Sequence, residues 1–178
     1  NRNCPTCQTH HRISWQEKTK KLALKTSHYQ IVVKLPSFIN DYFLKNYQDF
    51  VNILFESGKK TIYQILKYSQ YELTNPGIIM AMHTYGEENQ LHPHLHIVMT
   101  GGGLSSDEKN WIDYDNSLFS IDNFNVFYYT ILQDQLNKFT KKYPDLETEF
   151  KDLIKGINKH DLFISQKYPS ADNVINYL

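Results

Sequence analysis

Residues 78–100 read IIMAMHTYGEENQLHPHLHIVMT, and this stretch decides the fold that we expect. Its two ends, residues 78–84 and 92–100, are rich in apolar and β-branched residues, which is typical of strands. Between them, residues 86–90 (GEENQ) are polar and turn-forming. Two strands joined by a short polar connection pair as a hairpin, so the sequence predicts an antiparallel sheet built around these residues.

Two histidines, His94 and His96, share one face of the second expected strand. Side chains at i and i+2 of a strand point the same way, with Cα atoms about 7 Å apart. The two imidazoles therefore suit shared coordination of one cation, while Leu95 and its alternating neighbours can pack on helices. A bare His-x-His is more often a pair of ordinary histidines on a half-buried strand, so the motif needs support.

The hairpin brings a third imidazole to the same place. If the turn centres near Glu88, residues whose numbers sum to about 176 or 177 face each other, which sets His83 opposite Pro93 or His94. Three imidazoles would leave positions open for water or substrate, as a catalytic metal site requires. Glu87, Glu88 and His92 remain alternatives for the third ligand.

The flanking segments predict further strands and several helices. Residues 29–35 form a β-branched run that Pro36 ends, which indicates a buried strand, and Ser37 then looks like a helix N-cap. Apolar residues follow at helical spacing up to residue 69, and we expect Gly58 to divide them into two helices. The remaining expected features are a turn at 76–77, a sharp exit or close ligand approach at 101–103, strands at 111–114, 118–121 and 162–165, helices at 124–142 and 145–157, and a last helix capped by Ser170 or Asp172. This pattern predicts an α+β fold, in which a central antiparallel sheet carries the His-x-His hairpin and is packed by helices.

Length and charge narrow the class of protein. A chain of 178 residues can bury one substantial core, and no apolar stretch approaches the length that spans a bilayer. We therefore expect an intracellular protein with no membrane partner. The formal net charge is zero, yet residues 1–34 hold seven Lys or Arg against one acid. Candidate phosphate contacts in this basic segment are Lys18, Lys20, Lys21 and Lys25, although a solvated linker face explains them equally well.

The two cysteines, Cys4 and Cys7, form a Cys-x-x-Cys pair. This pair is half of a four-ligand structural zinc site rather than a disulfide framework. His10 and His11 could complete the set, or two ligands could lie upstream in a longer protein.

Several motifs in order resemble the rolling-circle insertion-sequence transposases of the HUH endonuclease superfamily, which is named for its His-hydrophobic-His motif. The resemblance spans nearly the whole chain. It rests on residues 4–7 (CPTC) with Trp15, 35–36 (LP), 82–86 (MHTYG), 92–96 (HPHLH), 100–104 (TGGGL), Trp111 and 174–178 (VINYL). It implies a zinc-module remnant and linker over residues 1–22 and an HUH-type nuclease domain over residues 23–178, truncated at both ends.

The resemblance also implies a reaction. Tyr177 would attack a phosphate of single-stranded DNA at the element ends and form a 5′ phosphotyrosine, with Mg²⁺ or Mn²⁺ held by the histidines. Gly101 and Gly102 become candidate DNA contacts, and Tyr85 and Trp111 could stack on unpaired bases. The family's type has two tyrosines about one helical turn apart, and this chain ends at Leu178, before the second. The expected setting is the cytoplasm of a prokaryote, at the nucleoid, and a homodimer is compatible with it.

Three other hypotheses stay open. A rolling-circle replication initiator or relaxase would use the same chemistry in another setting. A zinc hydrolase would use His83, His94 and His96 with water as its nucleophile and would need no tyrosine. A binding module would hold DNA without metal-dependent turnover.

Overall fold

A five-stranded antiparallel sheet organises the chain. The computed structural model describes residues 5–86, 90–157 and 162–178. The strands are β1 (His28–Lys34), β2 (Thr74–Tyr85), β3 (Leu91–Ser105), β4 (Trp111–Asp113) and β5 (Phe163–Ile164). Four of them lie in the order β2-β3-β1-β5, and β4 pairs with the far end of β3. The expected α+β class and the β2–β3 hairpin are confirmed.

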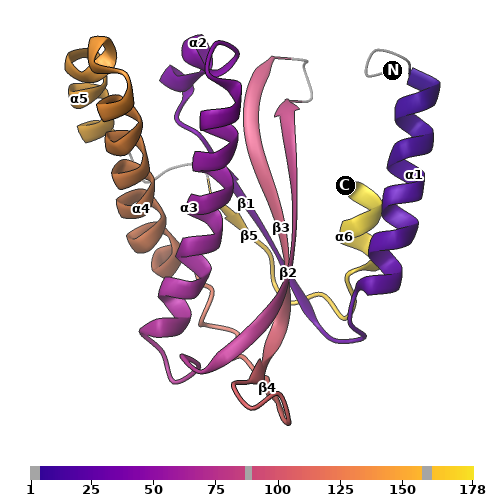
Figure 1. Cartoon of the computed structure of the whole chain (residues 1–178). Coiled ribbons are helices and arrows are strands. Elements are labelled where there is room, and N and C mark those ends of the chain that lie inside the picture. The colour runs from indigo at the N-terminus through magenta and orange to yellow at the C-terminus, as the bar shows by residue number, and fades with distance from the viewer. Residues whose placement is uncertain (1–4, 87–89, 158–161) are drawn as a thin grey trace.

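Helices cover both faces of this sheet (Figure 1). On one side lie α3 (Tyr47–Lys67), α4 (Ile121–Lys142) and α5 (Glu147–Lys155), and on the other lie α1 (Pro5–Leu22) and the short α6 (Asp172–Tyr177). Short turns of helix complete the chain at Ser37–Ile39, at α2 (Asn40–Phe43) and at Pro144–Leu146. None of the described helices is long and apolar enough to cross a membrane.

Strict alternation along β3 separates the two faces. Leu95, Ile97 and Met99 are fully buried in the main core, which also takes the apolar faces of α3 and α4. Alternate residues point the other way, and Val98 belongs to a second, smaller core with residues of α6. The histidines His94 and His96 are in register with Val98, so they lie on the face that α1 and α6 share.

Gly58 does not divide the long helix, as the sequence had suggested. Helix α3 runs unbroken from Tyr47 to Lys67 with Gly58 buried inside it. A Cβ at Gly58 would lie 2.9 Å from Ile97 Cδ1 and 3.2 Å from Leu95 Cδ2. The missing side chain lets the helix approach the sheet, which offsets the roughly 1 kcal/mol that glycine costs in a helix. Ser37 is also not the cap of this helix, because it lies in the separate 3-10 turn.

The expected turn at residues 76–77 and the expected exit at 101–103 are both strand. Pro76 lies in β2 next to a shift of register, and β2 is an edge strand, where proline is tolerated. The three glycines lie within β3, and all are buried. A Cβ at Gly102 would lie 2.5 Å from the Ile112 carbonyl oxygen. The close approach is therefore made by protein atoms of the β4 segment.

The expected strand at 118–121 is wrong, because residues 116–119 form a turn that leads into α4. Ser120 caps this helix through its side chain, which accepts from the Asn123 amide at 3.2 Å. Phe119 is buried against Tyr29 and Tyr114, so the apolar run serves the core. The other expected helices and strands are present, but neither Ser170 nor Asp172 is the N-cap of the last helix. That residue is Ala171, which makes no side-chain cap hydrogen bond, and Asp172 is the first residue of α6.

Candidate metal centre and cleft

Pairing on both sides of β3 sets the positions of the candidate ligands. His94 pairs with His83 of β2 and with Lys34 of β1, while His96 pairs with Ala81 and Val32. Directly paired residues of adjacent strands point to the same face. Of the two predicted partners of His83, Pro93 and His94, the structure has His94.

Three imidazoles converge on that face. The ring centroids of His83 and His96 are 4.6 Å apart, those of His94 and His96 5.0 Å, and those of His83 and His94 5.3 Å. Ligand nitrogens of all three lie within 4.8 Å of one another, so the set could hold one metal ion.

A neighbouring carbonyl orients His94. Its Nδ1 donates to the carbonyl oxygen of His92 at 2.7 Å, so the ring is held with Nε2 as the nitrogen that can bind a cation. The His92 ring lies 5.5 Å from that of His94, but His92 is outside the set of three converging ligands. The alternatives Glu87 and Glu88 lie outside the described residues.

Burial lowers the pKa of His83 and of His96. The pKa of His96 is lowered to about 4, first by desolvation and then by the nearby rings of His83 and His94. Burial, and then the charge of His94, also lower the pKa of His83. Metal ions bind the neutral form of imidazole, so these shifts favour coordination near pH 7.

The cluster opens into a cleft of about 910 Å³. Strands β1, β2, β3 and β5 form its floor, and Val174 of α6 contributes to its wall. Its lining residues are Gln30, Val32, Lys34, His83, Tyr85, Gly86, Gln90, His92, His94, His96, Phe163, Tyr168 and Val174. The sequence did not single out Lys34 or Phe163, because only the long-range pairing of β1 with β3 and β5 brings them here.

The candidate nucleophile lies on the helix beside this cleft. Tyr177 is the last residue of α6, and its side chain lies outside the described part of the structure. Val174, Ile175 and Leu178 of this segment are buried in the smaller core. Cys4 lies outside the described residues, and Cys7 falls within α1 with its side chain outside them.

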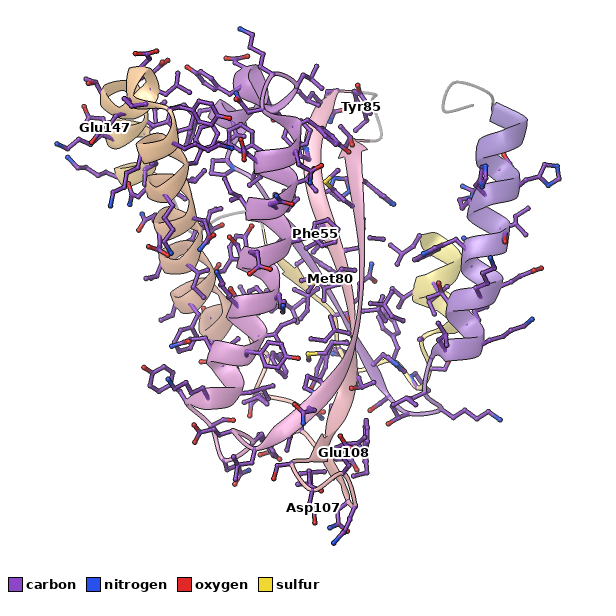
Figure 2. The ribbon with its side chains drawn as sticks, viewed as in Figure 1. Phe55, Met80, Tyr85, Asp107, Glu108 and Glu147 are labelled. Carbon is purple, nitrogen blue, oxygen red and sulfur yellow. The ribbon has the colours of Figure 1, made fainter. Side chains whose placement is uncertain are left out.

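The remaining candidate contacts are spread over the chain. Lys18, Lys20 and Lys21 lie on α1 and Lys25 follows it; all are exposed except the half-buried Lys20. Figure 2 shows Tyr85 at one end of the hairpin and Glu108 at the other. Tyr85 is 55% exposed and lines the cleft.

Two of the sequence candidates lie away from the cleft. Trp111 pairs with Leu104 at the end of β3 that is remote from the histidines. Gly101 and Gly102 are buried, so their hypothesised contact with DNA would require a change in their surroundings.

The family follows from comparison with known proteins. Residues 77–178, more than half of the chain, match the family model described as "Putative transposase", and the chain belongs to this transposase family. A curated relative, "Putative transposase y4qJ" of Sinorhizobium fredii (strain NBRC 101917 / NGR234), is 32% identical over 111 residues. The match covers 62% of this chain and 28% of that relative, so the chain corresponds to less than a third of it. No solved structure gave a significant match.

Proposed function

We propose that the chain is the nuclease core of a transposase that cuts and rejoins single-stranded DNA in rolling-circle transposition. In this proposal its fold is of the HUH endonuclease type. His83, His94 and His96 hold a divalent metal, Mg²⁺ or Mn²⁺, and Tyr177 is the nucleophile. The observation that carries the proposal is the convergence of three imidazoles on a cleft in a chain of a transposase family.

The location of α6 supports the choice of nucleophile. Val174 lines the cleft, and Tyr177 follows it by three residues in the same helix. Positions three apart lie on one face of a helix, so position 177 shares the face of α6 that borders the cleft. The small core around Val98 holds this helix against the histidine-bearing face of the sheet.

The chemistry follows from these groups. A cation bound to the three imidazoles would polarise the scissile phosphate and offset the charge that develops in the transition state. The phenolic oxygen of Tyr177 loses its proton and forms a bond to phosphorus as the bond to the 3′ oxygen breaks, and the leaving 3′ oxygen takes up a proton and becomes a hydroxyl. Because the phosphodiester is kept as phosphotyrosine, rejoining needs no ATP. The pKa of tyrosine is ordinarily about 10, so the reaction needs help in removing its proton.

A covalent-adduct assay tests the proposal. The protein is incubated with Mn²⁺ or Mg²⁺ and 3′-labelled single-stranded oligonucleotides from element ends, and label that migrates with protein is sought on a denaturing gel. We expect an adduct that is lost with EDTA, with His94→Ala and with Tyr177→Phe. Tyr168→Phe is the matched variant, because Tyr168 is another tyrosine of the cleft. An adduct that survives Tyr177→Phe but not Tyr168→Phe would identify Tyr168 as the nucleophile instead.

The zinc-hydrolase alternative predicts another pattern on the same gel. Free cleaved product would appear without any adduct, and Tyr177→Phe would leave the cleavage intact. Retained cleavage in a His94→Ala, His96→Ala double variant would contradict both the transposase proposal and the zinc-hydrolase alternative, because each depends on the metal.

A further inference from the structure

The cleft has the charge of an anion-binding site. Among its described lining residues none is Asp or Glu, and Lys34 is the one with a formal positive charge. The imidazoles of His83, His94 and His96 line the cleft beside it. A divalent cation on them would therefore meet no carboxylate from these residues, and the described lining would attract phosphates.

Lys34 lies directly beside the metal ligands. It is half-buried at the end of β1, and it pairs with His94 across the sheet, so its side chain is on the same face. Its carbonyl oxygen accepts a hydrogen bond from the hydroxyl of Tyr128 at 2.9 Å, and this buried bond fixes the backbone at that position. The lysine thus extends from a rigid strand, between the imidazoles and β5.

Phe163 lies on the other side of Lys34. It pairs with Val32, which in turn pairs with His96, so Phe163 lies on the histidine face. Its ring is 50% exposed and lines the cleft, while the next residue, Ile164, packs against the main core. An exposed phenyl ring next to a lysine and a candidate metal centre is the arrangement by which proteins hold unpaired nucleotides.

We propose that Lys34 and Phe163 form a nucleotide subsite next to the metal centre, in which Lys34 binds a backbone phosphate and Phe163 stacks on the adjoining base. The inference rests on the proposed function, and it adds the path of the DNA. The order across the sheet is imidazoles on β2 and β3, then Lys34 on β1, then Phe163 on β5. The single strand therefore crosses the strands of the sheet towards β5. A base can offer its face to the ring only when it is unpaired, so the subsite selects single strands.

Equilibrium binding in EDTA tests the subsite without any cleavage. The affinity for a fluorescent oligothymidylate is measured by anisotropy over a series of salt concentrations. Lys34→Gln should weaken binding and reduce the slope of log K against log salt by about 0.7, the value for one phosphate contact on a single strand. Phe163→Ala should weaken binding by about 5- to 100-fold with the slope unchanged, because stacking is not ionic. Lys34→Arg and Phe163→Trp should restore most of the affinity.

Control variants separate these effects from general ones. Lys59→Gln removes an exposed charge from α3, on the opposite side of the sheet, and should change neither affinity nor slope. Duplex of the same length should bind more weakly than the single strand and should be insensitive to Phe163→Ala. An unchanged slope in Lys34→Gln, or equal losses for single strand and duplex in Phe163→Ala, would overturn the subsite. If these signatures hold but the wild-type protein forms no adduct, the proposed function fails and the subsite stands.

Discussion

Removing one buried imidazole should remove much of the acid sensitivity of the folded protein. His96 is 3% exposed, and its pKa is lowered from 6.5 to about 4 by burial and by the neighbouring rings. Below pH 6.5 the unfolded chain therefore binds a proton that the folded chain does not bind. Acid then favours unfolding, and the loss of stability from this group begins near pH 6.5 and is complete near pH 4.

The size of the effect follows from the two pKa values. With 6.5 in the unfolded chain and about 4 in the folded chain, lowering the pH from 7 to 5 reduces the free energy of unfolding by about 2 kcal/mol through His96 alone. His96→Leu cannot be protonated, so it lacks this contribution. The direct effect of the substitution on packing is the same at both pH values and cancels in the comparison.

Urea denaturation in EDTA measures the difference. The free energy of unfolding of the wild-type protein and of His96→Leu is determined at pH 7 and pH 5, followed by circular dichroism. We expect the wild type to lose about 2 kcal/mol more than the variant over this interval. His10→Leu is the control, because it removes an exposed histidine of α1 in place of a buried one. If the free energy of unfolding depends on pH equally in the wild type and in His96→Leu, the inference that His96 is buried and neutral is refuted.

Three further predictions concern the metal and the sheet. His83→Ala should weaken Mn²⁺ binding, measured by titration calorimetry, by at least about tenfold, because a direct ligand matters no less than an outer-shell partner; unchanged affinity would remove His83 from the site. Gly102→Ala should lower the free energy of unfolding by about 1–3 kcal/mol, because the new methyl would meet the Ile112 carbonyl oxygen, which is backbone and cannot move aside; a stabilised variant in urea denaturation would contradict this packing. Thr74→Val should cost about 1–3 kcal/mol, because the buried Thr74 hydroxyl lies 2.9 Å from the Tyr114 hydroxyl; a thermal melt equal to that of wild type would show that this bond contributes nothing.

The sequence was sufficient where local rules decide the structure. Alternation predicted the faces of β3, and the short polar connection placed His83 opposite Pro93 or His94, of which the structure has His94. These are properties of a single hairpin, so they can be counted along the chain. The two strands that carry the three histidines, β2 and β3, were therefore predictable.

The sequence was not sufficient where distant segments meet. Gly58 reads locally as a helix breaker, yet the structure uses it as the contact between α3 and the side chains of Leu95 and Ile97. Lys34 and Phe163 lie far apart in sequence and reach the cleft only through the pairing of β1 with both β3 and β5. No periodicity encodes such pairing, which depends on the packing of the whole domain.

The contacts that stabilise α6 determine how readily this helix unfolds locally. A six-residue helix is not stable alone in water, and this one is held by a small core of Val98 with Ala171, Val174, Ile175 and Leu178. Helix α1 packs on its outer side, where the Gln16 side chain donates to the Asn176 carbonyl oxygen at 3.0 Å. Helix α1 thus stabilises α6. Removal of α1 should speed amide hydrogen exchange in α6 while β3 stays protected. The N-terminal helix thus controls the local unfolding of the C-terminal helix.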